Sequence, residues 1–212
     1  MFSVLALVVA GGMDASADDP HPEFRWLAAT GQSEIGDLCV PMDPPCPDGA
    51  IASSNGGTIE MTGEGKLSIE ALDDPEPRGV SGGGSYLHRD STGAIVDIGT
   101  WTAEELLSFV RFGGLLGPLG TLQAGNALME VRLVSDLTGD ESDGIFELGC
   151  RILGDEPTIE GVRIDVEGVA NFDISFDDVG DPRSTLFIRI GSVLEDEEDD
   201  SDSDSDSDSD DD

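Results

Sequence analysis

Basic side chains are scarce in this sequence. Its 212 residues include 10 Lys and Arg against 46 Asp and Glu, which gives a formal net charge of −36 at pH 7. Nine of the ten bases are arginines, and Lys66 is the only lysine. The negative electrostatic potential of such a chain repels phosphate backbones and anionic lipid headgroups, so nucleic acids and anionic membrane surfaces are excluded as partners. Cations and basic proteins remain as candidate partners.

The acidity is not confined to one end of the chain. Residues 195–212 hold thirteen of the 46 carboxylates, so the rest of the chain keeps a formal charge of about −23. This Asp-rich, Lys-poor composition is similar to that of halophilic proteins, in which hydrated carboxylates keep a domain soluble in concentrated salt. A G+C-rich genome would also favour Arg over Lys, so both explanations stay open.

Long apolar runs are missing too. The stretch at residues 2–10 is far shorter than the ~20 apolar residues of a membrane-spanning helix. It is followed by Ala15-Ser16-Ala17, the small-x-small pattern at which signal peptidase cleaves. Residues 1–17 are therefore predicted to be a signal peptide, and the protein is predicted to be secreted or held at the extracellular surface. No basic residue precedes the apolar stretch, and a buried strand is the alternative.

Only three cysteines are present. Cys39 and Cys46 enclose a proline-rich loop, and in an exported protein they are predicted to form a disulfide. Cys150 lies in an alternating run whose apolar face predicts a buried thiol. The alternative is three free thiols in a reducing compartment.

The pattern along the chain is dominated by period-two alternation. Residues 18–55 are rich in Pro, Asp and Gly and predict an irregular N-terminal arm, whereas 56–194 predict a β domain. Alternating runs lie at 59–62, 67–71, 94–98, 129–133, 146–152, 162–166, 172–176 and 186–190. About eight to nine short strands, each with one apolar face, predict an all-β fold, an antiparallel β-sandwich or barrel.

Two glycine-rich stretches interrupt this pattern. Gly63-Glu64-Gly65 separates the first two runs and predicts the turn of a hairpin. The stretch 81–85 contains three consecutive glycines, but no Lys and no predicted helix follow it. It therefore predicts a bulge or a tight strand crossing rather than a phosphate-binding loop.

One segment is ambiguous between helix and strand. Thr102 to Glu105 has the form of a capping box before an apolar run, which predicts one short helix. The same residues also continue an alternating strand, on a face that would bury Glu105, so a bulged strand is the alternative. Glu104 and Glu105 are adjacent, which directs them to different faces and argues against an opposed carboxylate pair of the glycosidase type.

Motifs typical of catalysis are not found. The sequence has neither a Gly-x-Ser-x-Gly elbow nor an HExxH pair, and it has two histidines, His21 and His88. His88 is followed by Arg89 and Asp90 and is predicted to be a solvated histidine at the end of a strand, with a general base as the alternative. No catalytic or cofactor-binding residue is therefore assigned.

The loop from Asp136 to Gly144 carries four carboxylates. Asp136, Asp140 and Asp143 could supply three oxygens to calcium, at a spacing that differs from the EF-hand pattern. A polar turn in an acidic protein is the alternative interpretation. Calcium is thus the only cofactor candidate.

The C-terminal residues 195–212 include Ser-Asp repeats and are predicted to be a disordered acidic tail, because like charges at alternate positions cannot pack together. The sequence as a whole predicts a secreted or surface-associated acidic β-sandwich protein with a structural or binding role, not evidently catalytic. Two alternatives stay open: a low-affinity divalent cation (calcium) binding protein, and a β-barrel enzyme or small-ligand carrier with Tyr86, His88 and Trp101 near a pocket.

Overall fold

The fold is that of a computed structural model, which describes residues 22–28, 47–69, 79–117, 120–152, 157–179 and 185–190. Three predictions concern residues outside this part of the chain: the signal peptide at 1–17, the Cys39–Cys46 disulfide and the acidic tail at 195–212.

The described chain is built from strands. The first six are β1 (Glu23–Ala28), β2 (Asp48–Ile51), β3 (Thr58–Ser68), β4 (Val80–Arg89), β5 (Ile95–Gly117) and β6 (Gly120–Ser135). The remaining five are β7 (Glu141–Cys150), β8 (Gly161–Val166), β9 (Ala170–Phe172), β10 (Ile174–Ser175) and β11 (Thr185–Ile190). A single 3₁₀ turn, η2 (Asp177–Val179), is the only helical element among the described residues. The predicted all-β, antiparallel class is therefore confirmed.

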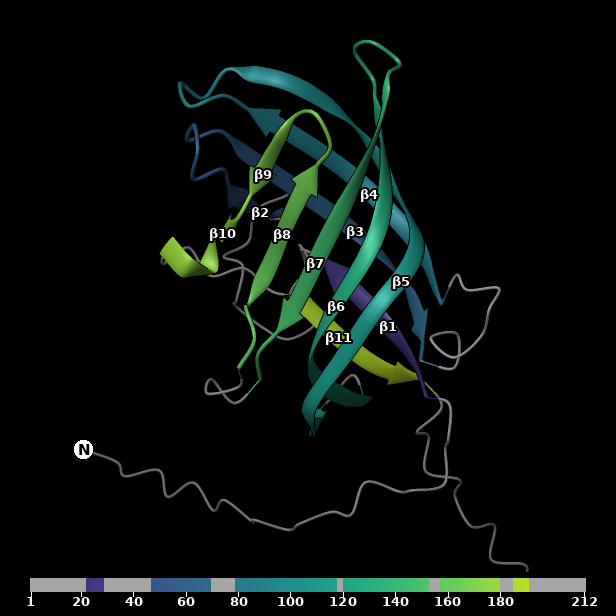
Figure 1. Ribbon diagram of the computed structural model, residues 1–212. Helices are drawn as coiled ribbons and strands as arrows, with labels where there is room; N and C mark the ends of the chain where they lie inside the picture. Colours follow the sequence, from purple (N-terminus) through teal and green to yellow (C-terminus); the bar gives the residue numbers. More distant parts are fainter. Residues whose placement is uncertain are drawn as a thin grey trace, which may run out of the picture.

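All eleven strands belong to one sheet. Its order is β10-β2-β3-β1-β11-β6-β7-β8-β9, and β4 and β5 lie off this path, linking β3 to β6. The sheet curls into a partial ring and not a complete barrel, since β9 and β10, the two ends of the path, are not hydrogen-bonded to each other. Figure 1 shows β7 and β8 in front of β3 and β4, with the two groups crossing at an angle.

The core lies inside this ring and is rich in aromatic side chains. The indoles of Trp26 and Trp101 stack with their centroids 5.5 Å apart, and Phe146 lies 4.9 Å from Trp101. Phe24 packs edge-on against Phe109. Burial of such large rings is the main source of stability for a single sheet of this kind. No helix in the described part of the chain is long and apolar enough to span a membrane.

The glycines of β3 make room for the two indoles. β3 runs without interruption through Gly63 and Gly65, so the predicted hairpin turn is wrong. A Cβ on Gly63 would lie 2.6 Å from Cζ2 of Trp101, and one on Gly65 would lie 2.5 Å from Cζ2 of Trp26. Both distances are far below van der Waals contact, so the glycines are required by packing rather than by a turn.

The second glycine stretch pairs with the first. In the β3–β4 ladder Gly84 lies opposite Gly63 and Gly82 lies opposite Gly65. A Cβ on Gly84 would lie 2.6 Å from Cα of Gly63. The stretch 81–85 is thus part of strand β4, at a point where the backbones of β3 and β4 approach closely. This agrees with the predicted tight strand crossing.

β5 resolves the ambiguity of the segment after Thr102. It is a single bulged strand, and the alternative of a short helix is wrong. Its register with β6 shifts between Ala103 and Glu105, between Leu106 and Ser108, and between Arg111 and Gly113. Because each bulge adds one residue, the buried positions Ala103, Leu106 and Phe109 follow one another at intervals of three. That interval imitates the period of an amphipathic helix.

The prediction that residues 18–55 form an irregular arm is partly wrong. Two segments within 18–55 are strands of the sheet: β1 pairs with both β3 and β11, and β2 pairs with β3 and β10. These strands are short: β1 alternates only from Glu23 to Trp26, and β2 contains a glycine and a buried aspartate. Cys150, at the end of β7, is 1% exposed, which confirms its predicted burial.

Candidate binding groove

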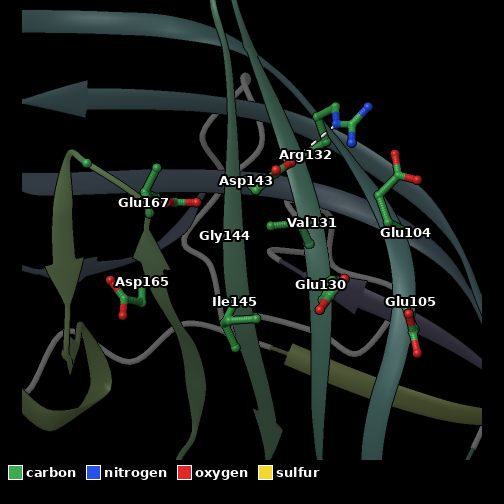
Figure 2. Close-up of a pocket in the computed structure, with 12 residues that line it drawn as sticks. Glu104, Glu105, Glu130, Val131, Arg132, Asp143, Gly144, Ile145, Asp165 and Glu167 are labelled. Atoms are coloured by element: carbon green, nitrogen blue, oxygen red, sulfur yellow. Dashed lines mark hydrogen bonds and ion pairs between the residues drawn. The ribbon is translucent and has the colours of Figure 1, made fainter.

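A hollow lies on the outer face of β5, β6, β7 and β8. It is an open groove of about 750 Å³. Six carboxylates and one guanidinium line it: Glu104, Glu105, Glu130, Asp143, Asp165, Glu167 and Arg132. Figure 2 shows these side chains along neighbouring strands and, for Glu167, at the end of one of them. We call this surface the acidic groove.

The acidic groove follows from strand alternation. Met129, Val131 and Leu133 of β6 point into the core, so the residues between them, Glu130 and Arg132, point outward. The same rule applies to β8, where Val162, Ile164 and Val166 are buried and Asp165 is exposed. Each strand therefore presents its polar positions to the same outer face.

The register between strands brings like charges together. Glu105 of β5 lies opposite Glu130 of β6. Ile145 of β7 lies between Glu130 on one side and Asp165 of β8 on the other. Like charges directly opposite each other across a ladder are destabilising, so this row of carboxylates costs the free protein stability and would be relieved by a bound cation.

The first bulge of β5 adds a carboxylate to the acidic groove. In a regular strand, adjacent residues point to opposite faces, and from this rule Glu104 and Glu105 were predicted to diverge. That prediction is wrong, because the register shift between Ala103 and Glu105 leaves both glutamates half-buried and lining the groove.

Arg132 is the single base in the acidic groove. Its Nε lies 3.3 Å from Oδ1 of Asp143, and its Nη1 lies 3.8 Å from Oε2 of Glu141. The hydrogen bond and charge of Asp143, together with Glu104 and Glu141, raise the pKa of the Arg132 guanidinium. The five other groove carboxylates form no ion pair with Lys or Arg among the described residues. Their charge is thus available to a ligand.

The three aspartates predicted to bind calcium have separate roles. Asp136 and Asp140 are exposed in the β6–β7 turn, where the backbone N–H of Ser135 donates to the carbonyl oxygen of Asp140 at 2.9 Å. Asp143 lies on β7 and pairs with Arg132. In the described part of the chain, no group of three or more His, Cys, Asp and Glu side chains is arranged to hold a metal ion. The calcium site stays a prediction.

Tyr86 and His88 were candidates for a catalytic pocket. The hydroxyl of Tyr86 donates to Oδ2 of Asp97 at 2.7 Å, and Ser135 Oγ donates to Oδ1 of the same carboxylate at 2.6 Å. Burial, assisted by this hydrogen bond, raises the pKa of Tyr86. Asp97 thereby ties β4, β5 and β6 together. This arrangement suits a structural hydrogen-bond network, in which both carboxylate oxygens are occupied.

His88 lies near the end of β4, as predicted, and is half-buried rather than fully solvated. Its ring packs edge-on against Phe172 with centroids 5.2 Å apart. Burial lowers the pKa of His88, against the opposing effect of Asp97 and Asp90. Trp101, the third pocket candidate, is a core residue whose Nε1 donates to the carbonyl oxygen of Thr62 at 3.0 Å. Tyr86 and Trp101 therefore belong to the packed interior, and His88 lies at its margin.

A second acidic cluster joins the buried carboxylate of Asp48 and the half-buried carboxylate of Glu160. Asp48 is fully buried and accepts hydrogen bonds from the backbone N–H of Gly49 at 2.7 Å and from Thr185 Oγ1 at 2.8 Å. Glu160 accepts from the backbone N–H groups of Arg151 at 2.5 Å and Thr185 at 3.4 Å. Burial raises the pKa of Glu160 from 4.5 to about 8, and the charges of Asp177 and Asp48 act in the same direction.

Sequence reasoning missed both acidic sites for different reasons. The groove carboxylates are spread over residues 104 to 167 and come together only through the strand order. The signal that could have found them is the regular occurrence of Glu and Asp at the polar positions of neighbouring strands. Glu160 and Asp48 lie far apart in sequence and outside the alternating runs, so no local pattern marks them.

Comparison with known proteins gives no relatives. No family model matches the sequence, and no curated protein and no solved structure is significantly similar to this chain. The chemistry of the acidic groove and the sequence are therefore the basis for assigning a function.

Proposed function

We propose that this protein is a secreted or surface-associated binding protein, without a catalytic role, whose acidic groove takes a cationic segment of a partner such as a basic protein. The observation that carries this proposal is the groove itself, a hollow of about 750 Å³ with six carboxylates and one arginine. A concave surface of one charge sign focuses the electric field and attracts ligands of the opposite sign.

The spacing of the carboxylates favours a ligand with several positive charges. Neighbouring strands lie about 4.8 Å apart, so the four strands of the groove spread its carboxylates over roughly 14 Å. An extended peptide places side chains of the same face about 7 Å apart. A Lys- or Arg-rich peptide that crosses the strands can therefore contact Glu130 with one side chain and Asp165, two strands away, with the next.

Binding to this surface should depend strongly on salt. Five of the six carboxylates lack a basic partner among the described residues, and the groove is open to solvent. Attraction between exposed charges weakens as the Debye length falls from about 10 Å at 0.1 M salt to about 3 Å at 1 M. A cationic partner would therefore associate most tightly at low ionic strength.

The location is proposed from the sequence. The apolar stretch at 2–10 and the Ala15-Ser16-Ala17 site support cleavage of a signal peptide and export. Outside the cell, the strong negative charge of the chain would meet basic proteins and cations rather than intracellular nucleic acids. N-terminal sequencing of the exported protein tests this proposal, with Asp18 as the expected first residue.

Isothermal titration calorimetry with an oligolysine peptide tests the groove. The full-length protein is compared with the double variant Glu130→Gln, Asp165→Asn, and with the control Glu23→Gln, which removes an exposed carboxylate on β1. Loss of two groove carboxylates should weaken binding about two- to thirty-fold, because exposed ion pairs contribute about 0.2–1 kcal/mol each. The control should keep the wild-type affinity apart from a small change in net charge.

Two results would contradict the proposal. A loss of affinity that is no greater per carboxylate in the groove variant than in the Glu23→Gln control would show that binding reports net charge alone. Absence of binding at low ionic strength would show that the groove does not take a polycation. Because the acidic tail is present in every variant, its own attraction for oligolysine cancels from the comparison.

A further inference from the structure

β5 has an open edge along much of its length. It pairs with β6 along one edge up to Gly117, but its pairing with β4 on the other edge ends where Thr102 lies opposite Gly83. From Leu106 to Gly117, no strand pairs with this second edge in the described part of the chain. Unpaired backbone N–H and C=O groups along such an edge are a template for pairing with another strand.

The same edge is apolar and almost free of charge. The sequence from Leu106 to Met129 contains no Asp or Glu, in a chain that has 46, and its only base is Arg111. Side chains on this part of β5 are nevertheless exposed: Val110 and Leu115 are each 50% exposed, and Leu116 is 67% exposed. An exposed apolar strand edge on an otherwise acidic molecule is typical of a contact surface.

We propose that the open edge of β5 pairs with the same edge of a second copy of this chain, as an antiparallel two-fold dimer. A two-fold axis near Ser108 would place residues three positions before it opposite residues three positions after it. Glu105 and Arg111 stand at those two positions, so each copy would supply the acid for the other copy's base. The edge is thus complementary in charge to itself.

Electrostatics favour this contact over others between two copies. Each chain carries a formal charge of −36, so most approaches of two copies oppose carboxylates to carboxylates. The stretch from Leu106 to Met129 is the longest part of the described chain without a carboxylate, and it lets two copies meet without that cost. The bulges of β5 limit regular pairing between the two copies to a short segment. In a two-fold dimer each copy covers the open edge of the other, so no open β5 edge is left for a third copy.

A second copy explains the edge better than a membrane does. Insertion of this edge into lipid would leave its backbone N–H and C=O groups without hydrogen-bond partners, which is costly in hydrocarbon. Pairing with another strand satisfies those groups and buries the exposed leucines and Val110 at the same time. A contact of this kind should strengthen with salt, because salt screens the repulsion between the two acidic bodies.

Sedimentation equilibrium of the full-length protein in molar salt tests the proposal. The wild-type chain of 22.2 kDa should sediment as a dimer in a concentration-dependent equilibrium. Val110→Glu should raise the dimer dissociation constant by about ten-fold or more, since it adds a charge to both copies beside the axis. The matched control is Val169→Glu, which changes a valine of similar exposure, 51%, in the turn after β8 and should dimerise like the wild type.

A charge exchange tests the orientation of the two strands. Arg111→Glu alone should weaken the dimer by opposing two glutamates across the axis, and the double variant Arg111→Glu, Glu105→Arg should restore it. A wild-type chain that stays monomeric in molar salt overturns the proposal. So does a dimer that Val110→Glu and Val169→Glu affect equally, and failure of the double variant to recover overturns the placement of the axis. Circular dichroism of each variant checks that the fold is retained.

Discussion

At the scale of single residues, one half-buried carboxylate, Glu160, couples folding to pH. Glu160 lies between the end of β7 and the start of β11, where two backbone N–H groups donate to it. These hydrogen bonds favour the charged form, but burial outweighs them and raises the pKa to about 8. The described charged groups that face Glu160 are Asp48 on β2 and Asp177 in η2, and both oppose its ionisation. Neutral Glu160 is therefore the form that fits the fold.

This pKa predicts a loss of stability as the pH rises. A carboxyl whose pKa is raised on folding contributes its full stability below the unfolded value of 4.5, and that contribution is lost as the pH rises towards about 8. The unfolding free energy of the wild type should fall by a few kcal/mol, on the order expected for a shift of this size. Glu160→Gln, which keeps an uncharged side chain of the same shape, should lack this fall.

Urea unfolding of both proteins between about pH 5 and about pH 8 measures the effect. Glu167→Gln is the control, because it removes one exposed carboxylate and changes the net charge equally. The difference in unfolding free energy between wild type and Glu160→Gln should grow with pH, while the difference for the control should stay nearly constant. Parallel curves for all three proteins would show that folding does not raise the pKa of Glu160.

At the scale of elements, the bulges of β5 decide which side chains enter the core. Leu106 is 3% exposed and Leu107 is 38% exposed. A strand that alternated regularly from Trp101 would bury Leu107 and expose Leu106 instead. The bulges therefore exchange the roles of two adjacent leucines, which makes them a direct test of the register.

Leu106→Ala should cost about 2–5 kcal/mol of unfolding free energy, because it opens a cavity in the core. Leu107→Ala, the matched control on the surface, should cost less than about 1 kcal/mol. Denaturant unfolding of the two variants gives the comparison. A larger loss for Leu107→Ala would mean that the strand runs without the bulge between Ala103 and Glu105.

The same elements show what could be predicted from the sequence. Period-two alternation marked most strands from β3 to β11, because one face of each is buried and the other solvated. It failed where packing is non-local: Gly63 and Gly65 are small because indoles from β1 and β5 cover them, and no neighbour in sequence reveals this. β1 and β2 were missed for a similar reason, since their burial comes from strands distant in the chain.

The candidate site could be predicted only in part. The excess of acid and the preference for cationic partners were evident from composition. The position of the acidic groove was not, because it requires the order β5-β6-β7-β8 and the bulge that turns Glu104 and Glu105 to one side. A bulge depends on the pairing of two strands, so a single strand's sequence does not specify it.

At the scale of the whole molecule, negative charge opposes the compact state. The residues before the tail carry a formal charge of about −23, and folding brings these charges close together. The groove concentrates six of the carboxylates on one face, with one arginine among them. Salt screens this repulsion, since the Debye length falls from about 30 Å at 0.01 M to about 3 Å at 1 M. Folding should therefore be favoured by salt.

The melting temperature should rise markedly between low salt and molar salt, as differential scanning calorimetry can measure. A chain cut after Leu194 should show nearly the same rise, because most of the repulsion acts between carboxylates of the folded body. Neutralising Glu130 and Asp165 together should reduce the rise, since both lie in the like-charged row of the acidic groove. A melting temperature indifferent to salt would refute self-repulsion in the body, and a rise that disappears with residues 195–212 would assign it to the tail.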